Sequence, residues 1–206
     1  MAGNYINSYD VKTLAQISYE DLGFNTDGDY EAWLDNELIP QVEAVIDAYC
    51  GVPSGFFKAG GQTFADERYD YDEDFIQLKH YPVLSISKVY YNKAGYAQSE
   101  DWEEISSTYY ILYSEQGLLK IVQKVPAIKE RSIKVTYTAG YSSTPEAVKH
   151  VCAQLCTNIL HIILQRKVSP VVRIDEFVVR MVVSEAFTLE LKLMLAPYVR
   201  RQVASG

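Results

Sequence analysis

The chain has 206 residues, enough to bury one sizeable core, alone or with an inserted subdomain. Its three cysteines are an odd number without the spacing of a disulfide framework, and no N-terminal apolar stretch has the length of a signal peptide or membrane span. We therefore expect synthesis in a reducing cytoplasm and no membrane partner, and the formal net charge of −8 argues against a surface built to grip nucleic-acid phosphates.

Two helices are predicted near the N-terminus. Apolar residues recur at helical spacing after Asp10, and Gly23 is expected to stop this first helix. From Asp29 to Cys50 the apolar positions keep a 3.6-residue period, and Gly51 closes the second helix. Pro40 lies inside the second helix and removes a backbone donor, so a kink just before it is expected.

Strands are predicted between Gly55 and Tyr141, where the period changes to alternation and turn residues recur roughly every ten positions. We expect about five or six antiparallel strands. Two of them, at 109–113 and 118–122, flank a turn in which Gly117 can take a positive φ, which indicates a hairpin. The last strand runs from Ser132 to Thr138, where apolar and polar residues alternate.

The C-terminal part is predicted to be helical, with one interruption. Thr144 suits an N-cap and Pro145 a first helical position, and a wide apolar stripe then continues to Lys167. The segment from Val171 to Val183 is rich in β-branched residues and indicates an extended or hairpin conformation. Ser184 is expected to cap a last helix that continues to residue 201.

These elements predict an α+β protein, a helical bundle with an inserted antiparallel β-rich subdomain and an extended segment before the C-terminal helix. We expect residues 1–54 to supply the N-terminal helices, 55–141 the inserted subdomain and 142–206 the C-terminal helices. The extended segment is placed at 168–183.

An acidic cluster is the first candidate for chemistry. It opens like a calcium loop at Asp70, Asp72 and Asp74, but Phe75 stands where the loop needs a glycine and Tyr81 where it needs a bidentate carboxylate. We interpret the cluster as a solvated turn before a strand. Its members are Asp66, Glu67, Asp70, Asp72, Glu73 and Asp74.

Cys152 and Cys156 lie four residues apart near His150 and His161, which raises a second metal-site hypothesis. Both thiols fall on the apolar stripe, so we interpret them as small buried hydrophobic side chains. The sequence carries no nucleophile elbow, zinc-protease helix or phosphate loop. We therefore predict no catalytic residue, no cofactor, no metal and no enzymatic activity.

Tyrosine is the unusual component, with 17 tyrosines against 7 phenylalanines. Tyrosine supplies rigid contact area with one polar end, as protein interfaces and sugar sites both use. Three function classes stay open. The tyrosines suit an assembly protein or an aromatic-rich carbohydrate-binding module, and the acidic cluster leaves a metal hydrolase as the third.

Five short phrases follow one another along the chain. The most informative is the junction of strand and Pro-initiated helix, with Val135, Tyr137 and Gly140-Tyr141 before Pro145. The others are the first helix at 10–23, the second helix from Leu38 to Tyr49, the Tyr81-Pro82-Val83 strand entry, and Leu195-Ala-Pro-Tyr198 followed by Arg200-Arg201. Together they resemble the head-tail connector (adaptor) proteins of long-tailed bacteriophages and related tailed viruses.

The resemblance implies a structural protein of the virion neck, between head and tail. It implies a ring of about twelve copies, a dodecamer, under the portal protein, which also meets a tail or head-completion protein. Viral DNA would pass through the lumen without sequence-specific binding, and an acidic chain suits such sliding because it repels phosphates.

An interface is predicted in the C-terminal region. The apolar residues of 168–183 are too many for an exposed linker, so we expect this segment to pair with a neighbouring subunit or with a portal or tail protein. The candidate interface residues are Val172, Ile174, Phe177, Val179, Met181, Tyr198, Arg200 and Arg201.

Overall fold

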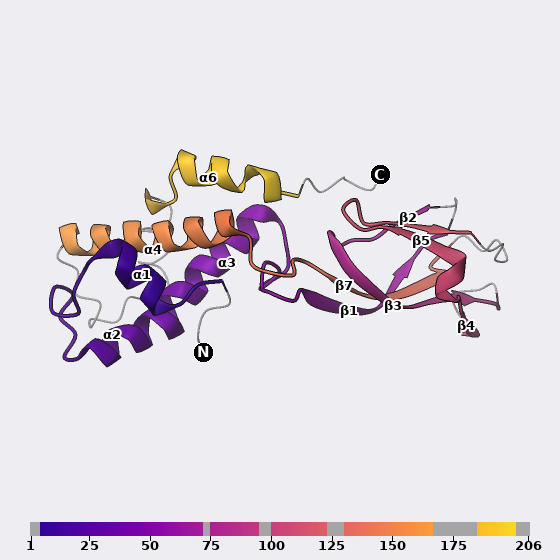
Figure 1. The fold of residues 1–206 in the computed structure, drawn as a ribbon, viewed down its shortest axis with the longest axis horizontal. Helices are drawn as coiled ribbons and strands as arrows, with labels where there is room; N and C mark the ends of the chain where they lie inside the picture. The colour runs from indigo at the N-terminus through magenta and orange to yellow at the C-terminus, as the bar shows by residue number, and fades with distance from the viewer. Residues whose placement is uncertain (1–4, 72–74, 95–99, 123–129, 167–184, 201–206) are drawn as a thin grey trace. The chain divides into compact units, whose positions relative to one another are not determined.

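The computed structural model describes residues 5–71, 75–94, 100–122, 130–166 and 185–200. It confirms the predicted α+β class (Figure 1). Helices form one compact unit from residues 1–57 and 144–206, and antiparallel strands form a second unit from residues 58–143. The chain therefore leaves the helical unit once, builds the β unit and returns.

The first helix, α1 (Ser8–Ala15), is shorter than predicted. Asn7 caps its start in a reciprocal capping box with Asp10, and Gln16 ends it by taking a left-handed conformation with φ of 52°. The expectation that the helix runs to Gly23 is wrong. The apolar period continues past the point where the backbone of Gln16 leaves the helix.

The second predicted helix is observed as three consecutive helical elements, α2 (Asp27–Trp33), the π-helical turn η1 (Leu34–Leu38) and α3 (Ile39–Cys50). The amide of Ile39 donates to the carbonyl of Leu34, five residues back, so the π turn lies directly before Pro40, where a kink was expected. Gly51 ends α3 with a φ of 67°, as predicted.

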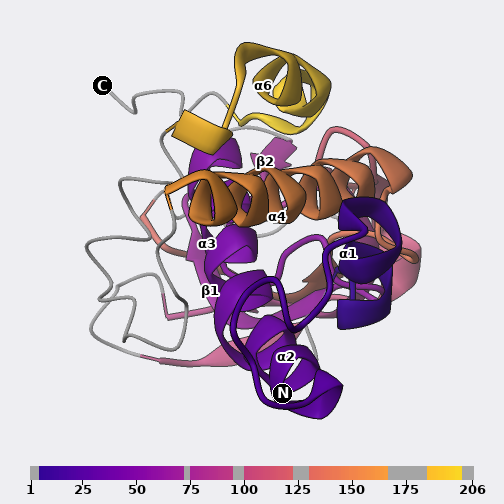
Figure 2. The same ribbon diagram turned by 90° about the vertical axis from the view of Figure 1, so that its left-hand side faces the viewer.

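The longest helix, α4 (Glu146–Arg166), is the core of the helical unit. It contacts α1, α3 and α6 (Figure 2), and Leu155 on its apolar stripe is fully buried. By length and composition alone, 146–165 is apolar enough to cross a membrane, but half of that stretch is buried inside the protein, as in a core helix.

The last helix begins later than predicted. The structure places α6 at Leu189–Leu195, followed by a 3-10 turn, η3 (Ala196–Tyr198). The side chain of Thr188 caps α6 by accepting from the amide of Leu191, so Thr188 and not Ser184 marks its start. The predicted extended segment at 168–183 lies outside the described residues.

The described part of the β unit contains seven strands in two antiparallel sheets. The four-stranded sheet has the order β1-β7-β3-β4 and the three-stranded sheet the order β2-β6-β5. Their bounds are β1 (Gln62–Tyr69), β2 (Phe75–Gln77), β3 (Val83–Asn92), β4 (Trp102–Glu104), β5 (Tyr110–Tyr113), β6 (Leu118–Ile121) and β7 (Ile133–Ala139).

Strand β7 is central to the four-stranded sheet and shows the predicted alternation. Ile133, Val135, Tyr137 and Ala139 are fully buried, and the residues between them are partly exposed. The predicted hairpin is also confirmed, because β5 pairs with β6. Gly117 in its turn has a φ of 65°, and an added Cβ would lie 2.7 Å from the Cβ of Tyr81, so only glycine fits there.

Candidate interaction surfaces

One face of the three-stranded sheet exposes apolar side chains. The strand register places Phe75 of β2, Lys120 of β6 and Ile111 of β5 in one row, and residues directly opposite share a face. Phe75 is 45% exposed and Ile111 48% exposed. The Lys120 ammonium lies 5.1 Å from the centroid of the Phe75 ring, so a single positive charge occupies the middle of the row.

The same face continues along the edge strand β5. The rings of Tyr113 and Phe75 have centroids 6.2 Å apart, and Tyr109 and Val122 are exposed beside them. The opposite face is the core side, where Ile76, Leu119 and Ile121 are buried. An antiparallel sheet with one face in the core usually turns a polar face to water, so this apolar outer face is a candidate contact surface. We call it the sheet patch: Phe75, Tyr109, Ile111, Tyr113, Lys120 and Val122.

A second apolar surface lies on the short helix α6 of the helical unit. Leu191 and Leu195 point into the core and are nearly or fully buried. Leu189 and Leu193, four residues apart and on one face, are 71% and 63% exposed. Met194 and Glu190 lie on the same side at helical spacing and are exposed. We call this the helix patch: Leu189, Glu190, Leu193 and Met194.

Two of the predicted interface residues, Tyr198 and Arg200, pack within the helical unit. The Tyr198 ring meets the Phe57 ring edge to face at 5.7 Å, and the Arg200 guanidinium lies 4.3 Å from the centroid of the Phe56 ring. The Arg200 amide also donates to the carbonyl of Cys50 at 2.9 Å. These contacts anchor the chain after α6. The other predicted interface residues, Val172, Ile174, Phe177, Val179, Met181 and Arg201, lie outside the described residues.

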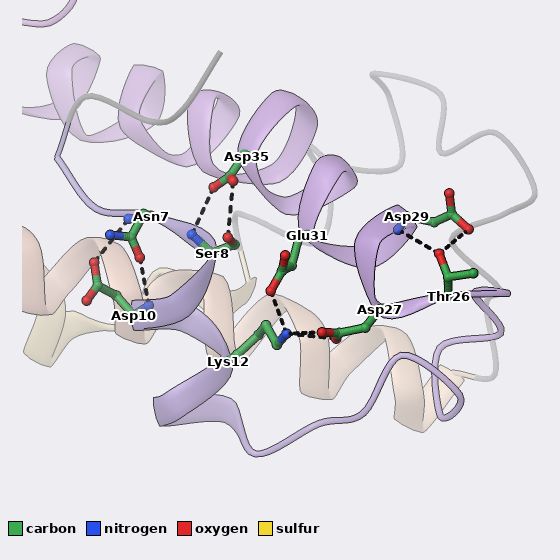
Figure 3. A network of polar contacts seen from close by, with 9 residues as sticks. All are labelled: Asn7, Ser8, Asp10, Lys12, Thr26, Asp27, Asp29, Glu31 and Asp35. Atoms are coloured by element: carbon green, nitrogen blue, oxygen red, sulfur yellow. Dashed lines mark hydrogen bonds and ion pairs between the residues drawn. The ribbon is translucent and has the colours of Figure 1, made fainter.

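Polar contacts hold α1 to the following helices (Figure 3). The Ser8 amide and hydroxyl donate to the two carboxylate oxygens of Asp35 at 2.8 and 3.1 Å. The Lys12 ammonium lies 2.7 Å from Asp27 and 2.8 Å from Glu31, and the hydrogen bonds that it donates to these carboxylates raise the pKa of Lys12. The network fixes α1, which packs on α4, against α2 and η1.

The acidic cluster is not a solvated turn throughout, which corrects the sequence-based interpretation. Asp66 and Glu67 belong to strand β1, and the Glu67 side chain is only 17% exposed. Its carboxylate accepts from the hydroxyl of Tyr69 and from that of Tyr137, the latter at 2.7 Å. Asp70 accepts from the Arg131 amide at the surface, and 72–74 lie outside the described residues.

The same network joins β1 and β7 to the segment before β3. The Tyr137 hydroxyl accepts from the His80 amide at 3.2 Å, and the Tyr69 hydroxyl accepts from the Lys79 amide at 3.2 Å. His80 Nε2 lies 3.6 Å from Glu67. Burial raises the pKa of both Tyr69 and Tyr137, so the phenols stay neutral donors to the Glu67 carboxylate.

A second buried network supports the helical unit. The Tyr5 hydroxyl donates to Asp47 at 2.6 Å, the Gly55 amide donates to the other oxygen of Asp47 at 2.9 Å, and the Tyr5 amide donates to Glu43 at 2.8 Å. Burial raises the pKa of Asp47 and of Tyr5. The network ties the N-terminal segment to α3, so these carboxylates serve the fold.

The cysteines behave as buried side chains, as predicted. Cys152 and Cys156 are fully buried free thiols in α4. The Cys156 thiol, together with burial, raises the pKa of Cys152, and burial raises the pKa of Cys50 to about 12, so these thiols are poor nucleophiles. Within the described ranges, no three His, Cys, Asp or Glu side chains gather where they could hold a metal ion.

Sequence reasoning missed both patches. The sequence of β5 is apolar on both faces, because the neighbours of Tyr109, Ile111 and Tyr113 are apolar as well. The sequence therefore does not indicate which face of the strand is buried. The signal for the helix patch was the spacing of Leu189 and Leu193 together with that of Leu191 and Leu195, which makes α6 apolar on two sides.

Comparisons with known proteins give one family. The family model described as head completion protein matches residues 26–159, more than half of the chain. Among solved structures, the neck of an empty GTA particle computed with C6 symmetry matches with 12% identity and a TM-score of 0.41, over 78% of this chain and 78% of that chain. No curated protein matches.

Proposed function

Because this chain belongs to the head completion protein family, we propose that it is a head-tail connector that forms a ring under the portal and lets DNA pass from head to tail. The match over 26–159 carries the proposal, since this region includes α2, α3, the whole β unit and most of α4. Family membership bears out the resemblance seen in the sequence and places the protein in the virus particle, in the neck.

The surfaces of the described residues support an assembly role. The sheet patch and the helix patch are exposed apolar surfaces on different units of the chain, and surfaces of this kind mark protein contacts. A ring needs two different surfaces on each copy, because its interface is heterologous and closes on itself. The family and these surfaces together favour a connector over the carbohydrate-binding alternative.

The proposed partners are further copies of the same chain, about twelve in the ring, together with the portal protein and a tail protein. The net charge of −8 favours passage of DNA over adhesion to it, since like charges repel. We propose a structural role without catalysis. The proposal from the sequence that 168–183 adds to a neighbouring chain stands beside it, and replacing 169–183 by a short Gly-Ser bridge tests that proposal by the loss of head-tail joining.

A virus that lacks this chain tests the proposed function. We expect heads and tails to accumulate as separate particles, with tailed particles restored when the chain is supplied in trans. Electron microscopy and infectivity counts measure both outcomes. A normal yield of tailed, infectious particles without the chain would overturn the proposal.

A further inference from the structure

We propose that the helix patch of one copy docks on the sheet patch of the next copy around the ring. The inference rests on the proposed ring and goes beyond it, because it assigns the two surfaces that meet. The sheet patch thus binds a second copy of this chain, which contacts it with Leu189, Glu190, Leu193 and Met194.

The two patches match in size. Helix α6 has seven residues and is therefore about 10 Å long at 1.5 Å per residue. The three strands of the sheet span two strand spacings, about 10 Å in total. One short helix can therefore cover the exposed apolar side chains of the sheet patch, and Leu189 and Leu193, one turn apart, can lie against the row of Phe75 and Ile111.

The two patches also match in charge. Lys120 is on the central strand, with Phe75 and Ile111 on either side of it. Glu190 lies on the exposed side of α6 between the directions of Leu193 and Met194. Within the described part of the chain, neither Lys120 nor Glu190 has an ion-pair partner, so each apolar patch brings one charge of opposite sign to the contact.

The charges also disfavour a contact between two sheet patches or between two helix patches. Two sheet patches face to face would bring two Lys120 ammonium groups together in an apolar setting, and two helix patches would bring two Glu190 carboxylates together. Pairing of unlike patches places Lys120 against Glu190. Such a heterologous contact leaves a pair of copies with one free patch of each kind, one at each end, and repetition then closes a ring.

Charge reversal tests the contact. We expect Lys120→Glu and Glu190→Lys each to prevent ring formation, so that native mass or light scattering reports monomer. The matched controls Lys58→Glu and Glu37→Lys reverse exposed charges outside both patches and should leave assembly unchanged. All four variants should stay folded, because three of the changed side chains are exposed and Lys120 is partly exposed.

Mixing identifies the partner. The Lys120→Glu and Glu190→Lys chains, each monomeric alone, should assemble when mixed, because every contact in an alternating ring then pairs opposite charges. The double variant should assemble alone. A disulfide test does not depend on charge. Ile111→Cys chains mixed with Leu193→Cys chains should form an interchain disulfide under mild oxidation, because the proposed contact brings these two positions together. The native thiols are buried and therefore do not compete.

Three outcomes would overturn the inference. Rings formed by both single reversal variants would show that the contact lies elsewhere, and the ring itself would stand. If the double variant formed rings but the mixture of single variants did not, the contact would lie between α6 and the sheet of the same chain. Absence of any ring from the parent chain, alone or with the portal, would remove the proposed function as well.

Discussion

Removing one hydroxyl from the β unit tests the buried network around Glu67. Tyr137 is fully buried on the central strand β7, and its hydroxyl donates to Glu67 and accepts from the His80 amide. Tyr137→Phe keeps the ring and its packing and removes these two hydrogen bonds, together with the 3.1 Å hydrogen bond between the Tyr69 and Tyr137 hydroxyls. The expected effect is therefore a loss of stability without a change of fold.

The magnitude follows from the two bonds. A hydrogen bond to a charged group contributes about 1.5–3 kcal/mol, and a buried amide left without its acceptor costs about 1–3 kcal/mol. Tyr69 still donates to Glu67 in the variant, which reduces the first contribution. We expect a net loss of about 2–4 kcal/mol, and a fall in melting temperature of roughly 2–4 °C for each kcal/mol in a chain of this length.

Urea denaturation followed by circular dichroism measures the loss. The matched control is Tyr9→Phe, which removes a hydroxyl from a tyrosine that is 73% exposed and should change the stability by less than about 0.5 kcal/mol. Equal stability of the Tyr137 and Tyr9 variants would refute the reasoning, because the network would then contribute nothing that water does not replace.

Three further predictions concern the buried tyrosines, the core of α4 and the acidic cluster. Folding raises the pKa of the buried phenols of Tyr5, Tyr69 and Tyr137, so the folded state keeps their protons to a higher pH than the unfolded state. The free energy of unfolding should therefore be highest below the unfolded-state pKa of 10.0 and should fall as the pH rises above it. A free energy of unfolding that does not change with pH in this alkaline range, measured by urea titration, would contradict the prediction. Leu155→Asp places an unpaired charge at a fully buried position of α4 and should cost several kcal/mol; an unchanged melting temperature would show that α4 is not the core helix. Alanine at Asp70, Asp72 and Asp74 together should leave fold and assembly intact, and loss of a bound metal ion from this triple variant, detected by elemental analysis, would argue for a metal site.

The elements predicted well are those whose local pattern and tertiary burial agree. Strand β7 alternates because one face lies in the core, and α4 shows a clear stripe because three helices cover it. The stop of α3 was visible because Gly51 can take the left-handed conformation that ends the helix. In each case a property of neighbouring residues fixes the structure.

The elements predicted poorly depend on distant residues or on a backbone conformation that the apolar period does not report. Strand β1 was hidden by its acidic residues, because the partner that buries Glu67 is Tyr137, seventy residues away in sequence. The end of α1 depends on the backbone of Gln16, while the apolar period continues beyond it. The two patches could not be predicted, because apolar residues on two sides of β5 and α6 do not indicate which side the core covers.

The native mass of the purified chain, alone and with its portal protein, tests the central claim most directly. A connector ring predicts a species of about twelve times the 23.4 kDa chain mass, formed alone or on the portal. Particles imaged from the same sample should show a closed ring with a central channel. A chain that stays monomeric at every concentration and does not bind the portal would contradict the account.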